Sequence, residues 1–251
     1  MRPLIVRFGL GAIGTVYVAL GVASARVALL GARDREAGVS GALRFLLRQP
    51  LGPKLLLAVL AGVTGLAIVR LAEAFGRSRR RGALARAGLA LNAAGYSLLA
   101  WTAARLLWRI RRSDASLERS GIVWLLGVGW GPALIELVGA GVFLGGAYEA
   151  LQGIARKFPF RRAIRPRALA PLLIGIARFG LLARGLVLAA LGWFVFRAAR
   201  DLDPDGVRTI GGALGAFSKT ALGPLFAGIV ALGLAAYGVY VWMLMLLSRK
   251  V

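Results

Sequence analysis

The chain contains no cysteine and no histidine among its 251 residues. The absence of cysteine excludes disulfides and thiol catalysis, and the absence of histidine removes the most common general base. Without either residue type, the usual ligands of zinc and haem are also missing. We therefore expect no catalytic residues, no metal site and no cofactor, and we do not expect an enzyme.

Acidic residues are scarce as well. Ten Asp and Glu residues stand against 33 Lys and Arg residues, which gives a formal net charge of +23. A basic chain can bind nucleic acid, but here the basic residues are divided among segments at both ends of apolar stretches, and no nucleic-acid-binding motif lies between them. We expect no nucleic-acid partner.

Apolar residues are abundant instead. They make up 59% of the chain, and the mean hydropathy of +0.74 exceeds what a soluble domain of this length could bury. A membrane-spanning helix needs roughly 20 mostly apolar residues. Six stretches qualify, at about residues 4–30, 54–75, 84–108, 122–154, 169–198 and 221–247. The sequence therefore predicts an all-α integral membrane protein with six transmembrane helices.

One arrangement of residues occurs three times without a gap. An Arg is followed by Gly at position two, Arg at nineteen, Gly at forty-five and Gly at fifty-five, with Pro directly after the Gly at forty-five. The copies begin at Arg7, Arg86 and Arg178. Such a period indicates a triplicated unit. We predict repeat 1 at residues 1–76, repeat 2 at 83–154 and repeat 3 at 169–248, with a basic cytoplasmic linker at 155–168.

Each predicted repeat contains an even number of spans, so the three copies share one orientation in the membrane. Parallel repeats imply a pseudo-axis along the membrane normal, and three copies allow a pseudo-threefold bundle. A row of hairpins is the alternative.

The two Arg residues of each first helix would lie about 28 Å apart. We expect these pairs to anchor the helix at opposite membrane surfaces.

Small residues recur on the predicted first helices, seven and fourteen positions after the first Arg. Small residues on one face allow a neighbouring helix to approach closely within lipid. We predict a packing seam at these positions, and a second one at the Gly141 and Gly145 pair on the fourth span. The first seam comprises Gly14, Gly21, Ala93, Ala100, Gly185 and Gly192.

The segments between paired spans also follow a pattern. Residues 42–47 alternate in a way that suits a short interfacial helix, and Leu51-Gly52-Pro53 predicts the turn into the second span. Together with the Arg-Gly start, the Gly-Ala-Leu segment and the glycine-rich second helix, this resembles the bacterial membrane family known as domain of unknown function 1206. The resemblance implies three tandem two-helix repeats and six membrane helices, and it implies no activity.

Two basic clusters lie on the side that holds both predicted termini. Acidic residues lie between the paired spans, on the other side, and we place both termini in the cytoplasm of a multi-pass protein of the bacterial inner membrane. Basic clusters beside spans attract anionic lipid head groups. The predicted head-group contacts are Arg77, Arg79, Arg80, Arg81, Arg161, Arg162, Arg165 and Arg167.

Polar groups within the predicted spans are the remaining candidates for a site. Glu136 lies roughly 7 Å into the fourth span, and a membrane carboxylate is a functional-site hypothesis by default. We group it with Arg184 and Asn92 as a candidate intramembrane polar site. Glu73 and Glu149, at the ends of second helices, are expected to pair with a first-helix Arg or with water.

Two functions of different classes follow from these patterns. The first is a structural or accessory membrane protein that binds anionic lipids, a membrane-protein partner or a second copy of itself. The second is a permease or channel for protons or small solutes through the pseudo-threefold centre. The first is favoured because the candidate axis offers few polar groups.

Overall fold

The computed structural model describes residues 2–30, 38–76, 82–108, 127–155, 167–201 and 223–247, and within these ranges it contains helices and no strands. The prediction of an all-α chain is confirmed for these residues. The elements are α1 (Arg2–Leu30), α2 (Val39–Leu47), α3 (Gly52–Phe75), α4 (Ala83–Leu107), α6 (Gly131–Ala155), the short 3-10 helix η3 (Arg167–Leu169), α7 (Ala170–Arg200) and α9 (Gly223–Leu247).

Five of the described helices are long and apolar enough to cross a membrane. They are α1, α3, α6, α7 and α9, so the chain has the helices of a multi-pass membrane protein. Helix α4 has 25 residues but is not among the five. The sixth span therefore stays a prediction.

The predicted start of the fourth span is wrong. Residues 127–130 form turns, and α6 begins only at Gly131. The Gly131 amide donates a 2.8 Å hydrogen bond to the Val128 carbonyl, which closes a turn before Pro132 enters the first turn of the helix. The short helix predicted at residues 42–47 is present as α2.

A labelling experiment tests whether α4 crosses the membrane. Because the chain has no native cysteine, single cysteines can be introduced at Ser78, before α4, and at Ser113, after it. We expect a membrane-impermeant maleimide to label Ser78→Cys only from the cytoplasmic side of oriented vesicles and Ser113→Cys only from the other side. Labelling of both from one side would remove α4 from the spans.

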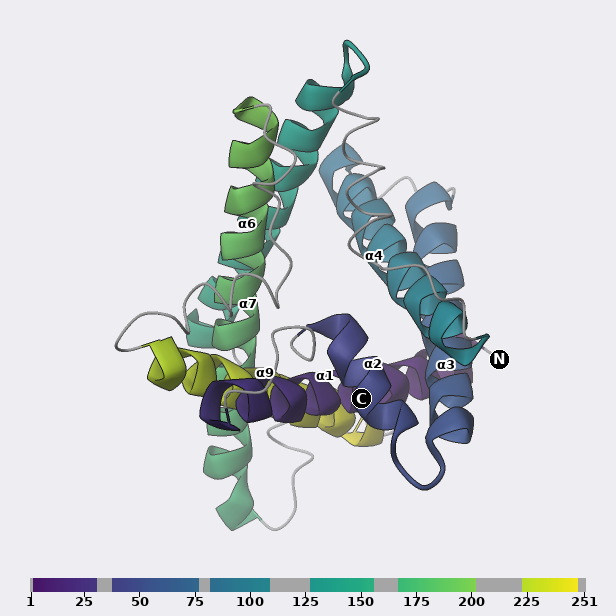
Figure 1. Ribbon diagram of the computed structural model, residues 1–251, viewed down its shortest axis with the longest axis vertical. Coiled ribbons are helices and arrows are strands. Elements are labelled where there is room, and N and C mark those ends of the chain that lie inside the picture. Colours follow the sequence, from purple (N-terminus) through teal and green to yellow (C-terminus); the bar gives the residue numbers. More distant parts are fainter. Residues whose placement is uncertain are drawn as a thin grey trace.

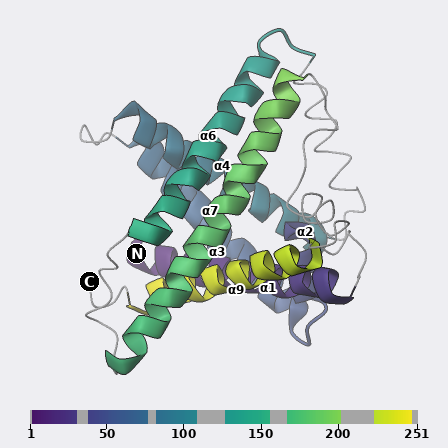
Figure 2. The ribbon, with the colours of Figure 1, turned by 90° about the vertical axis from the view of Figure 1, so that its left-hand side faces the viewer.

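The helices associate in three pairs. Helix α6 packs most extensively with α7, α1 with α9, and α3 with α4. Figure 1 shows the three pairs as the sides of a triangle, and in Figures 1 and 2 the α1/α9 pair runs across the α6/α7 pair. Two of the pairs, α3/α4 and α6/α7, join long helices that follow one another in the chain, whereas α1/α9 joins the first and the last described helix.

Close backbone contact at small residues holds two of these pairs together, α6/α7 and α1/α9. A Cβ atom at Gly185 of α7 would lie 2.7 Å from the carbonyl oxygen of Gly146 in α6, and one at Gly146 would lie 2.7 Å from that of Gly185. In the α1/α9 pair, a Cβ at Gly238 would lie 2.6 Å from the Gly14 carbonyl oxygen. Backbones can approach this closely only where side chains are absent.

The predicted first-helix seam is confirmed at these contacts. Gly21 and Gly192 also leave no room for a Cβ, and Ala93 and Ala100 are buried. The second predicted seam is wrong. A Cβ at Gly145 would meet nothing within 4 Å, and one at Gly141 only a leucine side chain at 3.8 Å. The α6 seam lies on another face of the helix, at Gly139, Gly146 and Gly153.

The first Arg of two predicted repeats makes the same kind of hydrogen bond, to a backbone carbonyl at the end of a neighbouring helix. The Arg7 Nε donates to the Met245 carbonyl, near the end of α9, at 3.2 Å. The Arg86 Nη2 donates to the Gly76 carbonyl, just after α3, at 2.9 Å. Each Arg thus satisfies a carbonyl at the C-terminal end of the helix with which its own helix pairs.

The predicted anchoring role is wrong for one second Arg. Arg105, near the end of α4, is 6% exposed and lies inside the protein. Helix α4 contacts α2 as well as α3.

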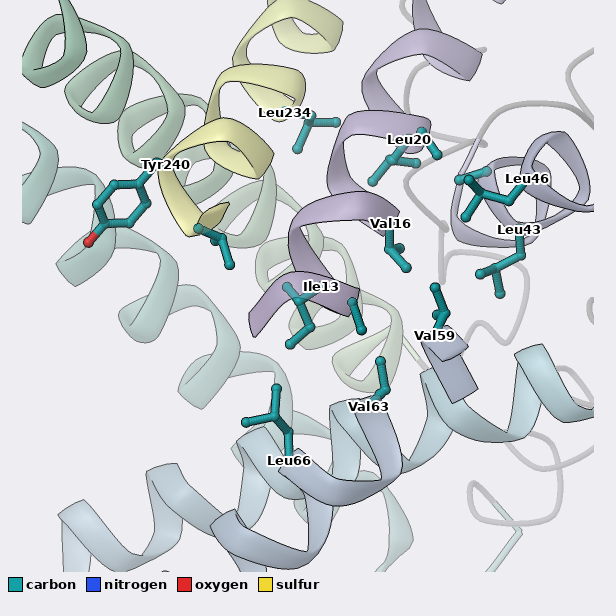
Figure 3. Close-up of a cluster of buried hydrophobic side chains, with 14 of the residues drawn as sticks. Ile13, Val16, Leu20, Leu43, Leu46, Val59, Val63, Leu66, Leu234 and Tyr240 are labelled. Atoms are coloured by element: carbon teal, nitrogen blue, oxygen red, sulfur yellow. The ribbon is translucent and has the colours of Figure 1, made fainter. Parts of the chain in front are cut away.

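The hydrophobic core lies where α1, α2, α3 and α9 meet. Figure 3 shows side chains from these four helices, of which Tyr240 points away from the side chains of α1, α2 and α3. The short helix α2 closes one side of the core. The labelled residues are Ile13, Val16, Leu20, Leu43, Leu46, Val59, Val63, Leu66, Leu234 and Tyr240.

Candidate functional site

Arg184 of α7 is the centre of a polar cluster. Its Nη1 donates to the Oε2 of Glu149 in α6, and the two groups form an ion pair. Its Nε donates a 2.7 Å hydrogen bond to the Tyr17 hydroxyl in α1. The side chains of Arg184 and Glu149 are 17% and 18% exposed. A single guanidinium therefore ties three helices together by polar contacts.

Aromatic rings surround the same guanidinium. The Arg184 Cζ lies 4.7 Å from the ring centroid of Tyr237 in α9 and 5.4 Å from that of Tyr17. The two rings contact each other edge to face at 4.7 Å. Tyr96 of α4 lies within electrostatic range of Arg184. Attraction between the cation and the ring faces adds to the ion pair.

The cluster lies at the middle of several helices. Arg184 is the fifteenth of 31 residues in α7, Tyr17 the sixteenth of 29 in α1, and Tyr237 the fifteenth of 25 in α9. Tyr96 is the fourteenth of 25 in α4, whereas Glu149 lies closer to the end of α6, at position nineteen of 25. Where these helices cross a membrane, their middles lie in the hydrocarbon region, where ionisable side chains are costly and mark functional sites.

The three residues grouped as a polar site from the sequence do not assemble. Arg184 is in the cluster. Glu136 lies near the start of α6, thirteen residues before Glu149, and is only partly buried. Asn92 is exposed on α4. Neither has a contact with Arg184 in the described part of the chain, so the site predicted around Glu136 is wrong in its membership.

The expected pairing of the two other span carboxylates is partly confirmed. Glu149 pairs with a first-helix Arg, as predicted. Glu73 pairs with Arg70 on its own helix α3, with the Arg70 Nη1 donating to the Glu73 Oε2 at 2.8 Å. No sequence signal joined Tyr17 and Tyr237 to Arg184, because the three residues come from three different helices and the sequence does not show which helices pack together.

The basic clusters are mostly beyond the described ranges. Arg77, Arg79, Arg80, Arg81, Arg161, Arg162 and Arg165 lie outside the described residues. Arg167 lies in η3 directly before α7 and is exposed. Its position beside the start of a candidate span is compatible with the predicted head-group contact.

The chemistry available at the cluster is ionic and hydrogen-bonding. It offers one guanidinium, one carboxylate and several phenol groups, with no thiol or imidazole in the chain. No group of three or more Asp and Glu residues is arranged to hold a metal ion among the residues that the structure describes. Binding of a charged group and tethering of helices are what this set of side chains can perform.

Comparison with known proteins places the chain among relatives without an assigned activity. Residues 8–77 and 179–244 match the family described as Domain of Unknown Function (DUF1206). Over 250 residues the chain is 32% identical to "Uncharacterized protein YxxB" of Bacillus subtilis (strain 168), covering 95% of this chain and 90% of that protein. No solved structure matches. With more than half of its length matched by the family and nearly all of it by one relative, the chain belongs to the family of proteins with domain of unknown function 1206.

Proposed function

We propose that the chain is a structural or accessory protein of the bacterial inner membrane, built as a closed ring of three two-helix repeats. In the ring, the first helix of each repeat packs against the second helix of the preceding repeat. The pairs α4 with α3, α7 with α6, and α1 with α9 follow this rule around a full circle. The family match to two separate segments, residues 8–77 and 179–244, supports the repeat.

The triangular outline in Figure 1 fits such a ring if every pair is tilted in the same sense around a common axis. The helices of the three pairs have 24 to 31 residues. At a rise of 1.5 Å per residue they are about 36 to 46 Å long, which exceeds a hydrocarbon layer of about 30 Å. Spans that are longer than the bilayer is thick accommodate by tilting.

The observation that carries the structural role is the way Arg184 connects the pairs. Its contacts join α7 to α6 on one side and to α1 and α9 on the other. Glycine contacts fix the helices within the α6/α7 and α1/α9 pairs, and Arg184 fixes one of these pairs to the other. A centre held in this way favours a rigid membrane scaffold, whose partners we propose to be anionic lipids and a membrane protein or second copy.

Lipid binding by the basic segments tests this function. Each basic residue near an anionic membrane surface contributes roughly 1 kcal/mol of attraction. Replacing Arg79, Arg80 and Arg81 together by Gln is therefore expected to lower the amount of phosphatidylglycerol that copurifies with the protein, as measured by mass spectrometry of the extracted lipid. The matched control is Arg109, Arg111 and Arg112 changed to Gln, at the proposed periplasmic side.

The control variant is expected to retain more phosphatidylglycerol than the cytoplasmic variant, because acidic residues such as Asp114 and Glu118 follow it in the sequence. Equal retention by both variants and the unchanged protein would contradict lipid binding through the cytoplasmic cluster.

A second function, passage of a small charged solute, is favoured by one specific observation. The Arg184 cluster is at the middle of α1, α7 and α9, and transporter sites commonly lie near the bilayer midplane where repeats meet. Glu136 is not required for this alternative, since it lies apart from the cluster.

A further inference from the structure

We propose that Arg184 is the binding residue of a small-oxyanion site at the centre of the protein, with carboxylate and phosphate groups as its ligands. The inference goes beyond the scaffold role. It stands whether or not the anion crosses the membrane, so binding and flux are separate tests.

The guanidinium has unused hydrogen-bonding capacity. Arginine has five N–H donors in a planar fork. Among the described residues, hydrogen bonds are made from Nε to Tyr17 and from Nη1 to Glu149, and Nη2 donates to none of them. A donor at the middle of apolar helices is costly to leave without an acceptor. The open edge of Arg184 is therefore suited to a ligand that brings acceptor atoms.

The surroundings determine the kind of ligand. Tyr17 and Tyr237 lie against the guanidinium with their rings, which leaves the edge of the fork as the approach for further acceptors. A planar fork matches the oxygens of a carboxylate or phosphate, two at a time. Glu149 already presents one carboxylate to this fork from within the protein, and it shows which chemistry the fork accepts.

The polar character of this site is specific to one part of the chain. At the repeat-equivalent positions of Arg184 and Tyr237, repeat 1 has Ile13 and Leu66, which are 3% and 1% exposed in the apolar core of Figure 3. Core packing at this position therefore does not require an arginine. Two apolar side chains, Ile13 and Leu66, fill the equivalent place in repeat 1. The charge of Arg184 in repeat 3 is therefore not needed for packing.

The mid-helix position also favours a free solute over a lipid head group, because head groups lie at the membrane surface. Glu149 competes with the solute for the guanidinium. Removal of the Glu149 charge therefore raises the affinity for an external oxyanion, whereas Arg184→Lys lowers it because an ammonium lacks the planar fork. These opposite changes are the signature of the site.

The test uses the full-length protein in nanodiscs of zwitterionic lipid, with acetate and inorganic phosphate as probes and chloride as the ionic-strength control. Affinity is measured from the saturable rise of the thermal unfolding midpoint with probe concentration. We expect Glu149→Gln to bind at least one probe about tenfold more tightly than the unchanged protein, corresponding to about 1.4 kcal/mol. We expect Arg184→Lys to bind it about tenfold more weakly. Arg197→Gln, an exposed arginine on the same helix, is the matched control and is expected to bind unchanged.

The outcomes separate the alternatives. No saturable stabilisation of either the unchanged protein or Glu149→Gln would overturn the proposal, as would equal affinities in Glu149→Gln and Arg184→Lys. Because Glu149→Gln is expected to increase the affinity, loss of folding cannot imitate its effect.

Repeating the measurement with phosphatidylglycerol in the nanodiscs distinguishes the source of the oxyanion. Inhibition of acetate binding by this lipid assigns the site to the lipid phosphate, and an unchanged affinity assigns it to a free solute. Binding without flux in liposomes supports the site and removes the transport function.

Discussion

Replacing Arg184 alone by Met is expected to destabilise the protein by about 3 kcal/mol, whereas replacing Arg184 by Met and Glu149 by Leu together is expected to cost less than about 1 kcal/mol. The single change leaves the Glu149 carboxylate without its cation among apolar helices. The double change removes both charges and puts apolar side chains of similar length in their place. The difference between the two results measures the coupling within the pair.

Thermal unfolding in one detergent, followed by tryptophan fluorescence, measures this coupling. The matched control is the Arg197 and Asp201 pair on α7, whose side chains are 67% and 58% exposed and whose closest N–O distance is 3.4 Å. Exposed pairs contribute about 0 to 1 kcal/mol, so the same substitutions there are expected to change stability little, singly or together. Additive effects at Arg184 and Glu149 would show that the pair does not act as a unit.

The sequence predicted the helices well because their signals are local. Apolar length and the threefold recurrence of Arg and Gly positions placed the helices, and five of them have the length and composition of spans. The start of the fourth span was predicted too early because residues 122–130 are apolar. A turn ending at Gly131 interrupts them, and hydropathy does not detect a turn within an apolar run.

The candidate site was harder to predict because its members come from different helices. Glu136 was predicted as a site residue because it is an acid inside a predicted span. The face of α6 that packs on α7 contains Gly139, Gly146 and Gly153, and Arg184 pairs with Glu149 instead. The spacing along one helix gives the face on which a residue lies. It does not give which helix packs on that face, and here α7 packs on its neighbour α6 and also on α9, while α1 packs on α9 from the other end of the chain.

The same limitation explains the wrong glycine pair. Gly141 and Gly145 have the GxxxG spacing that favours close helix contact, yet neither has a neighbouring backbone within reach of a Cβ. The seam that does form follows a spacing of seven on α6, matched to the spacing of seven between Gly185 and Gly192 on α7. The partner helix, which the sequence of α6 does not contain, selects one glycine face from two.

Two adjacent glycines of α6 provide the sharpest test of this packing. Gly146→Val is expected to destabilise the protein by about 3 kcal/mol or more, because overpacking alone costs about 1 to 3 kcal/mol and here the added atoms meet rigid backbone. A Cβ at Gly146 would lie 2.7 Å from the Gly185 carbonyl oxygen and would also contact the Ala189 amide nitrogen. The α6/α7 pair would have to separate, which would also pull Glu149 away from Arg184.

Gly145→Val is the matched control, since it adds the same atoms one position away, where nothing lies within 4 Å of a Cβ. In the middle of the same helix it is expected to change the unfolding midpoint only slightly, because replacing glycine restricts the unfolded chain while valine is a weaker helix former than alanine. The two variants have identical composition and hydropathy, so any difference between them reports helix packing and not insertion into the membrane. Equal stability of the two would mean that α6 does not present its Gly146 face to α7 in the bilayer, and the ion pair at the centre of the proposed scaffold would then lose its structural basis.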